Sequence, residues 1–210
     1  MTQNVSICIV LDRSGSMETC RLDALGAVNS YLRQVREDPD MVGRVSVLLF
    51  DTEGIDRIRD DVAIASCLDV APEEYQPRGG TPLLDAVGHA VELLEKRSRS
   101  DARSIIVIMT DGHENSSREH TKETISALLK RKQEESNWLM IYLGADHNAW
   151  DQAGHLGFAA ANTAQFSKGA LFAVGPALYQ RSSRYSKSAS AKDDRELGFS
   201  AEERSGMKGK

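Results

Sequence analysis

The chain has 210 residues, of which 40% are hydrophobic and 27% charged, and its formal net charge is −5. This length and composition suit one globular domain, or one domain with an appendage, and they exclude collagen-like, coiled-coil and wholly disordered proteins. Residues 1–180 carry a larger acidic excess than the whole chain, so nucleic acid is a poor expected partner.

The sequence gives no sign of a membrane segment or of secretion. No apolar run approaches the roughly 20 residues that a membrane-spanning helix needs, so we expect no membrane partner. The first four residues carry no basic side chain and make a poor secretory signal, which predicts a cytoplasmic protein. Cys8, Cys20 and Cys67 are widely spaced and fit neither a disulfide framework nor a zinc site, so we expect buried thiols.

The first part of the chain predicts a strand, a helix and two further strands, in that order. Residues 5–11 form a nearly unbroken apolar run, typical of a strand buried on both faces. In residues 21–37 apolar side chains recur every three or four positions, which predicts a helix. Residues 44–50 predict a second buried strand, and the charged segment 55–64 predicts an exposed antiparallel edge strand.

The second part alternates between strands and helices. A surface loop is expected over 67–80, after which Thr81 and Pro82 begin a helix as its N-cap and first residue. The later expected elements are a strand at 105–109, a helix at 120–135, a strand at 138–143, a short helix at 145–156, a strand at 160–166 and a helix at 168–185.

This alternation predicts an α/β fold: a doubly wound, mostly parallel, Rossmann-like sheet of about six strands with one antiparallel edge strand and helices on both faces. Residues 1–185 are expected to form this domain. Residues 186–210 have almost no aliphatic side chains, so we expect a disordered polar tail.

Polar side chains follow the predicted strands at one edge of the sheet, where ligands of doubly wound folds bind. They come from three stretches of the chain and comprise Asp12, Ser14, Ser16, Thr81 and Asp111. Two carboxylates about 4 Å apart repel by roughly 4 kcal/mol at an effective dielectric constant near 20, and a cation would reverse that cost. Oxygen ligands alone favour Mg²⁺, with Mn²⁺ as the second candidate.

These residues resemble the metal-ion-dependent adhesion site of von Willebrand factor type A domains. The match comprises the Asp12-x-Ser14-x-Ser16 motif, Thr81 within the GGTPLLDA stretch of residues 79–86, and Asp111 after the apolar strand. The resemblance covers roughly residues 4–165. Since no secretory signal or disulfide is evident, the chain is similar to the intracellular, stand-alone members found in bacteria and their viruses.

The resemblance implies that Ser14, Ser16 and Thr81 present hydroxyls to the ion, while Asp12 and Asp111 hold it directly or through water. It also implies that a carboxylate from a partner protein completes the coordination, so we expect a binding module and no enzyme. An ATPase chaperone or another operon-encoded protein is the kind of partner that the family suggests.

Two other functions stay open from the residues alone: a Mg²⁺-dependent phosphohydrolase and a structural component of a larger assembly. Ser14 stands where a paired-aspartate motif would place a second carboxylate, and the lysines, Lys168 included, fall on predicted helices or their ends. Both observations count against phosphoryl transfer.

Three further segments have simpler expected roles. His113 and Glu114 are expected in a solvated loop, because the second histidine of a HExxH motif is missing. Asp146 and His147 are interpreted as a helix N-cap. Residues 73–75, in the loop beside Thr81, are expected to help select the partner.

Overall fold

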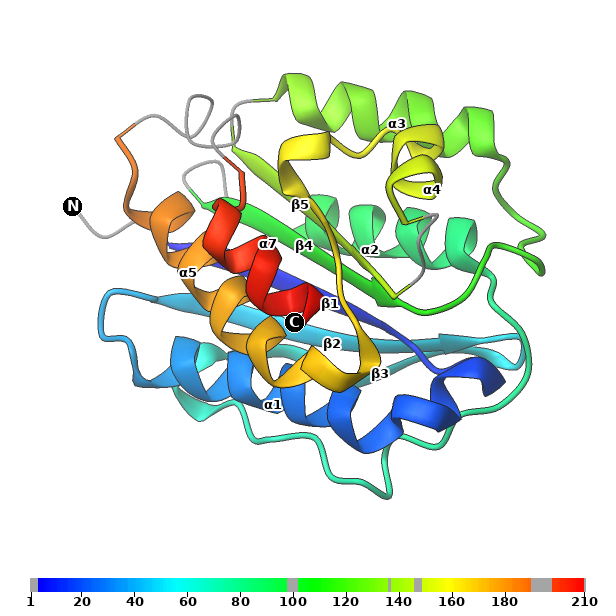
Figure 1. The fold of residues 1–210 in the computed structure, drawn as a ribbon. Coiled ribbons are helices and arrows are strands. Elements are labelled where there is room, and N and C mark those ends of the chain that lie inside the picture. Colours follow the sequence, from blue (N-terminus) through cyan, green and yellow to red (C-terminus); the bar gives the residue numbers. More distant parts are fainter. Residues whose placement is uncertain (1–3, 98–101, 136, 146–148, 190–197, 210) are drawn as a thin grey trace.

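The computed structural model describes residues 4–97, 102–135, 137–145, 149–189 and 198–209. Six strands form one sheet in the order β3-β2-β1-β4-β5-β6 (Figure 1). The strands are β1 (Val5–Asp12), β2 (Gly43–Asp51), β3 (Gly54–Ala63), β4 (Arg103–Thr110), β5 (Trp138–Gly144) and β6 (Thr163–Gln165). Only the pairing of β2 with β3 is antiparallel, which confirms the predicted edge strand and the fold class.

The central strand β1 is buried on both faces. Ile7, Ile9 and Leu11 belong to one apolar cluster, whereas Cys8 and Val10 belong to the other, because successive side chains of a strand point to opposite faces. Strands covered on both faces consist of continuous apolar residues, which is why β1 and β4 could be recognised in the sequence.

Helices cover the two faces of the sheet (Figure 1). The first cluster contains residues of α1 (Arg21–Glu37) and α5 (Val174–Lys187), and the second contains residues of α2 (Leu83–Arg97), α3 (Lys122–Glu134) and α4 (Ala149–Leu156). The helix predicted over 168–185 begins as a 3-10 segment, η4 (Lys168–Ala173), before α5. No helix within the described ranges is long and apolar enough to cross a bilayer.

The expectation of a disordered tail was wrong for residues 198–209. These residues include a further helix, α7 (Ala201–Lys208), which begins with a capping box at Ser200 and Glu203. Phe199 and Met207 are buried in the same apolar cluster as α1 and α5. Glu203 also pairs with Arg184 of α5 at 2.6 Å. Two apolar residues spaced eight positions apart are too sparse a pattern to indicate docking from sequence, although both are buried in the fold.

The parallel register sets the place of the candidate site. Leu11 of β1 lies opposite Met109 of β4, so the next residues, Asp12 and Thr110, end their strands at the same level. The carboxyl ends of the parallel strands therefore bring the predicted site residues to one edge of the sheet.

The three cysteines are free and buried, and burial raises the pKa of the Cys8 thiol to about 12.

Candidate metal centre

The first donor segment follows β1. Asp12 is fully buried, and its Oδ1 accepts a hydrogen bond from the backbone N–H of Ser14 at 2.7 Å. This bond turns the chain sharply, so that Ser14 and Ser16 point to the same side and their hydroxyl oxygens lie 3.1 Å apart. Ser16 is exposed, whereas Ser14 is buried, so the segment runs from the interior to the solvent.

The second donor segment lies beside the first. The backbone N–H of Gly15 donates to the carbonyl of Gly79 at 3.1 Å, and that of Arg78 donates to the carbonyl of Arg13 at 2.7 Å. Gly79 has a φ of +63°, a left-handed conformation that glycine adopts without strain. These contacts hold the loop against the Ser14 segment and bring the buried Thr81 to the start of α2.

The end of β4 supplies the third donor segment. The Asp111 Oδ1 atom accepts a hydrogen bond from the Ser16 hydroxyl at 2.5 Å, and Asp12 Oδ2 accepts one from the Thr110 hydroxyl at 2.5 Å. The side chain of Asp111 is only 3% exposed. Both carboxylates are therefore held in place by hydroxyls from the neighbouring segments.

Three of the five predicted side chains meet beside Gly112, and the other two contact one of these three. A methyl group added to this glycine would lie 2.8 Å from Thr81 Oγ1, 3.4 Å from Asp12 Oδ2 and 3.5 Å from Ser16 Oγ. Oxygens from two chain segments thus converge beside Gly112, which belongs to the third segment and has no side chain to fill the space between them. The Ser16 hydroxyl oxygen lies 3.1 Å from that of Ser14 and 2.5 Å from Asp111 Oδ1.

The donor chemistry fits a hard divalent cation. Nowhere in the described part of the chain do three or more His, Cys, Asp or Glu side chains form a possible metal cluster. The centre instead combines three hydroxyls with two carboxylates, which are ligands that Mg²⁺ and Mn²⁺ accept and that zinc does not favour. Burial raises the pKa of Asp12 to about 6, although hydrogen bonds from Thr110 and Ser14 oppose the shift. A bound cation would favour the ionised form.

Lys168 lies at the same edge of the sheet, although its proximity to the centre could not be recognised in the sequence. Lys168, the first residue of η4, places its Nζ atom 2.8 Å from Asp111 Oδ2 and also donates to the Thr19 hydroxyl. Lys168 lies at the start of a helical segment, as expected, but its position there does not keep it away from the centre. Lys168 follows β6 by three positions, so it belongs to the same edge of the sheet, but so short a strand is a weak signal in a sequence.

The loop before Thr81 supports the centre and does not present a recognition surface at Tyr75. The Tyr75 side chain is fully buried, and its hydroxyl donates to the carbonyl oxygen of Asp12 at 2.7 Å. Glu74 pairs with Arg59 through two hydrogen bonds of 2.7 and 3.0 Å. Tyr75 is buried, whereas Glu73 is exposed and the Glu74 side chain is 34% exposed, so partner selection by this segment stays a prediction that only Glu73 and Glu74 can carry.

A buried ion pair lies behind the first loop. The Arg13 guanidinium contacts Asp51 at the end of β2, with Nε 2.6 Å from Oδ2. Burial alone would raise the pKa of Asp51, but hydrogen bonds from Arg78, from the Glu53 backbone and from Arg13 lower it below its usual range. The pair fixes the backbone from which Ser14 and Ser16 extend.

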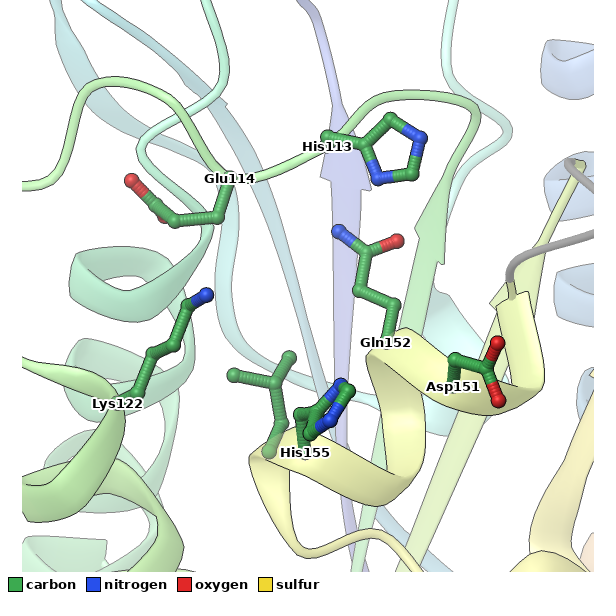
Figure 2. A pocket seen from close by; sticks show the side chains of 7 residues that line it. His113, Glu114, Lys122, Asp151, Gln152 and His155 are labelled. Carbon is green, nitrogen blue, oxygen red and sulfur yellow. The ribbon is translucent and has the colours of Figure 1, made fainter.

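A pocket of about 200 Å³ lies between the segment after β4 and the helix α4 (Figure 2). Its lining residues are His113, Glu114, Lys122, Asp151, Gln152, His155 and Leu156. The amide of Gln152 donates to the carbonyl of Gly112 at 3.3 Å, which connects the pocket wall to the donor segments.

His113 and Glu114 lie in a loop, as predicted, and His113 is exposed, but Glu114 is held by several hydrogen bonds. Glu114 accepts hydrogen bonds from the backbone N–H groups of Leu84, Ser116 and Ser117, at 2.8 to 2.9 Å. It therefore helps to cap the start of α2. Asp146 and His147, interpreted as an N-cap, lie outside the described residues.

Comparison with known proteins assigns the family. A family model for the von Willebrand factor type A domain matches residues 7–114, just over half of the chain. The chain therefore belongs to the von Willebrand factor type A family, whose domains are protein-interaction and adhesion modules. A search of curated proteins found no significant match.

Solved structures share the fold at low sequence identity. The manganese-loaded TRAP protein of Plasmodium vivax is 16% identical with a TM-score of 0.59, over 82% of this chain and 72% of that one. Proximal thread matrix protein 1 from the mussel byssus is also 16% identical, with a TM-score of 0.63, over 85% of this chain and 46% of that one. The chain thus spans about half of the mussel protein.

A single-domain relative matches nearly end to end. The von Willebrand factor domain of the pili tip protein Mfa5 from Porphyromonas gingivalis is 11% identical, with a TM-score of 0.62, over 92% of this chain and 99% of that one. At these identities the likeness establishes the fold alone.

Proposed function

We propose that the protein is a divalent-metal-dependent binding module, in which Mg²⁺, or Mn²⁺ in its place, is held at the edge of the sheet and coordinates an acidic residue of a partner protein. Ser14, Ser16 and Thr81 would supply hydroxyl oxygens, and Asp12 and Asp111 would balance the charge directly or through water. Bound there, the ion would supply an electrophilic position for a carboxylate.

One observation carries this proposal: oxygens of Thr81, Asp12 and Ser16 surround the space beside Gly112, and Ser14 and Asp111 contact Ser16. With only two carboxylates in the set, the ion would keep more of its positive charge than in a carboxylate-rich site. That charge favours an incoming anion. The manganese-loaded relative from Plasmodium vivax supports divalent metal binding in this fold.

The first test is metal binding by the full chain, measured by calorimetric titration with Mg²⁺ and with Mn²⁺. Gly112→Ala should abolish binding, because its methyl group would occupy the space between the oxygens. Gly26→Ala in α1 is the matched control, because a methyl group there meets no atom within 4 Å. Metal binding that is unchanged in Gly112→Ala would reject the centre.

The second test separates binding from turnover. The position of Lys168 beside Asp111 removes one argument against phosphoryl transfer, so phosphate release from a generic phosphate ester should be measured with Mg²⁺ present. We expect metal binding without turnover. Turnover that disappears in Asp12→Ala would instead identify a phosphohydrolase, and a metal effect on melting alone would favour a structural component of an assembly.

A further inference from the structure

The Lys168 ammonium group forms an ion pair with Asp111, one of the two carboxylates of the candidate metal centre. Its Nζ atom lies 2.8 Å from Asp111 Oδ2, and the carboxylate it contacts is almost entirely shielded from solvent. The Thr19 hydroxyl accepts a second hydrogen bond from the same ammonium. The side chain of Lys168 itself is 43% exposed, so solvent can receive it if it leaves Asp111.

Both oxygens of Asp111 are engaged within the protein. The Ser16 hydroxyl donates to Oδ1, and Lys168 donates to Oδ2. Ser16 is itself one of the proposed ligands, so a cation at the centre and the ammonium of Lys168 would lie close to the same carboxylate. Two positive charges so near to each other repel, and the carboxylate stabilises one of them at the expense of the other.

The backbone holds Lys168 at this position. Within η4, Ala170 and Leu171 are buried, which anchors the segment to the body of the domain. The residue before Lys168, Ser167, donates its backbone N–H to the carbonyl of Met207 at 2.9 Å, and Met207 is the buried anchor of α7. The contact with Asp111 is therefore supported by both η4 and the C-terminal helix.

We propose that Lys168 is an internal competitor of the divalent cation: it neutralises Asp111 when no metal is bound, and the metal must displace it, so that Lys168 sets the metal affinity of the centre. This inference rests on the proposed function. Lys168 acts through Asp111 and is a positioning residue, because its ammonium is not itself a metal ligand.

Calorimetric titration of the full chain with Mg²⁺ and Mn²⁺ tests the competition. Lys168→Met keeps the aliphatic part of the side chain and removes the charge, and it should bind metal about fivefold more tightly, the factor expected from loss of an ion pair worth about 1 kcal/mol. Lys168→Arg keeps the charge and should bind like the wild type. Lys96→Met on α2 changes the net charge equally, away from the centre, and should also bind like the wild type.

A charge-neutral variant separates the contact from the general effect of charge. Thr19→Val removes the second acceptor of the ammonium, and a 3.3 Å hydrogen bond from the Thr19 hydroxyl to the Ser16 carbonyl, without altering any charge. It should also tighten metal binding, by less than Lys168→Met. A structural role of Lys168 would give the opposite sign, because loss of a supporting contact would disorder Asp111 and weaken metal binding.

The outcomes distinguish this inference from the proposed function. If the wild type binds metal, Gly112→Ala does not, and Lys168→Met binds with unchanged or weaker affinity, then the competition is refuted and the binding module stands. If the wild type binds neither ion, or if Gly112→Ala binds metal normally, then the proposed function fails and Lys168 has no ion with which to compete.

Discussion

Replacing Asp12 by asparagine should stabilise the metal-free protein at neutral pH. Asp12 is fully buried, and burial raises its pKa from 3.8 to about 6. A carboxyl group that binds protons more tightly in the folded protein than in the unfolded chain lowers stability once it ionises. Asparagine keeps the acceptor for the Ser14 N–H, and its amide can donate to the Thr110 hydroxyl, which can act as an acceptor.

The size of the effect follows from the pKa shift. The rise of the Asp12 pKa from 3.8 to about 6 corresponds to a cost of about 3 kcal/mol at pH 7, which is the upper limit of what Asp12→Asn can recover. The cost disappears as the pH falls from about 6 towards 3.8, because the carboxyl group then becomes neutral in the folded protein. The advantage of the variant should therefore vanish over this pH range.

Urea unfolding measured in EDTA, at pH 7.5 and at pH 4.5, gives the free energies to be compared. Glu73→Gln is the control, because Glu73 is exposed and its replacement should change neither value. With Mg²⁺ at 100 times its dissociation constant, the wild type should gain about 2.7 kcal/mol, whereas Asp12→Asn should gain far less. The stability advantage of the variant should therefore shrink or reverse when metal is added.

Two results would refute this reasoning. One is a variant that is less stable than the wild type in EDTA at pH 7.5, because the buried charge would then be favourable without metal. The other is a difference between the two proteins that does not change between pH 7.5 and pH 4.5, because the effect would then have a cause other than ionisation.

Three further substitutions test the surroundings of the centre. Met207→Ala should lower the free energy of unfolding by about 2–5 kcal/mol in urea, and no change would show that α7 does not dock. Asp51→Asn should cost up to about 3–5 kcal/mol at pH 7, because the buried Arg13 guanidinium then keeps only the exposed Asp56 as an anion. Since the pKa of Asp51 is lowered, the stability of the wild type should fall as the pH drops below 3.8, and that of the variant should fall less. Equal falls in acid titrations would contradict the lowered pKa of Asp51. Tyr75→Phe should cost about 1 kcal/mol and weaken Mg²⁺ binding in calorimetry, and unchanged affinity would show that the Asp12 backbone does not need this hydrogen bond.

The strands and the edge of the sheet where the candidate site lies could be predicted from local patterns. Continuous apolar residues identify strands such as β1 and β4, because both faces of a parallel sheet are covered. Once those strands are parallel and adjacent, their carboxyl ends must meet at one edge. That rule is why Asp12 and Asp111, 99 positions apart in the sequence, could be expected to lie together.

The contacts that surround the centre were decided by the tertiary structure. Lys168 reaches Asp111, and Tyr75 reaches the Asp12 backbone, through pairings between segments that carry no shared pattern in the sequence. The docking of α7 depends on Phe199 and Met207, two apolar residues in a polar segment. Periodic patterns report the burial of whole elements, whereas a single long-range contact depends on where the folded backbone places each side chain, and a local pattern does not contain that information.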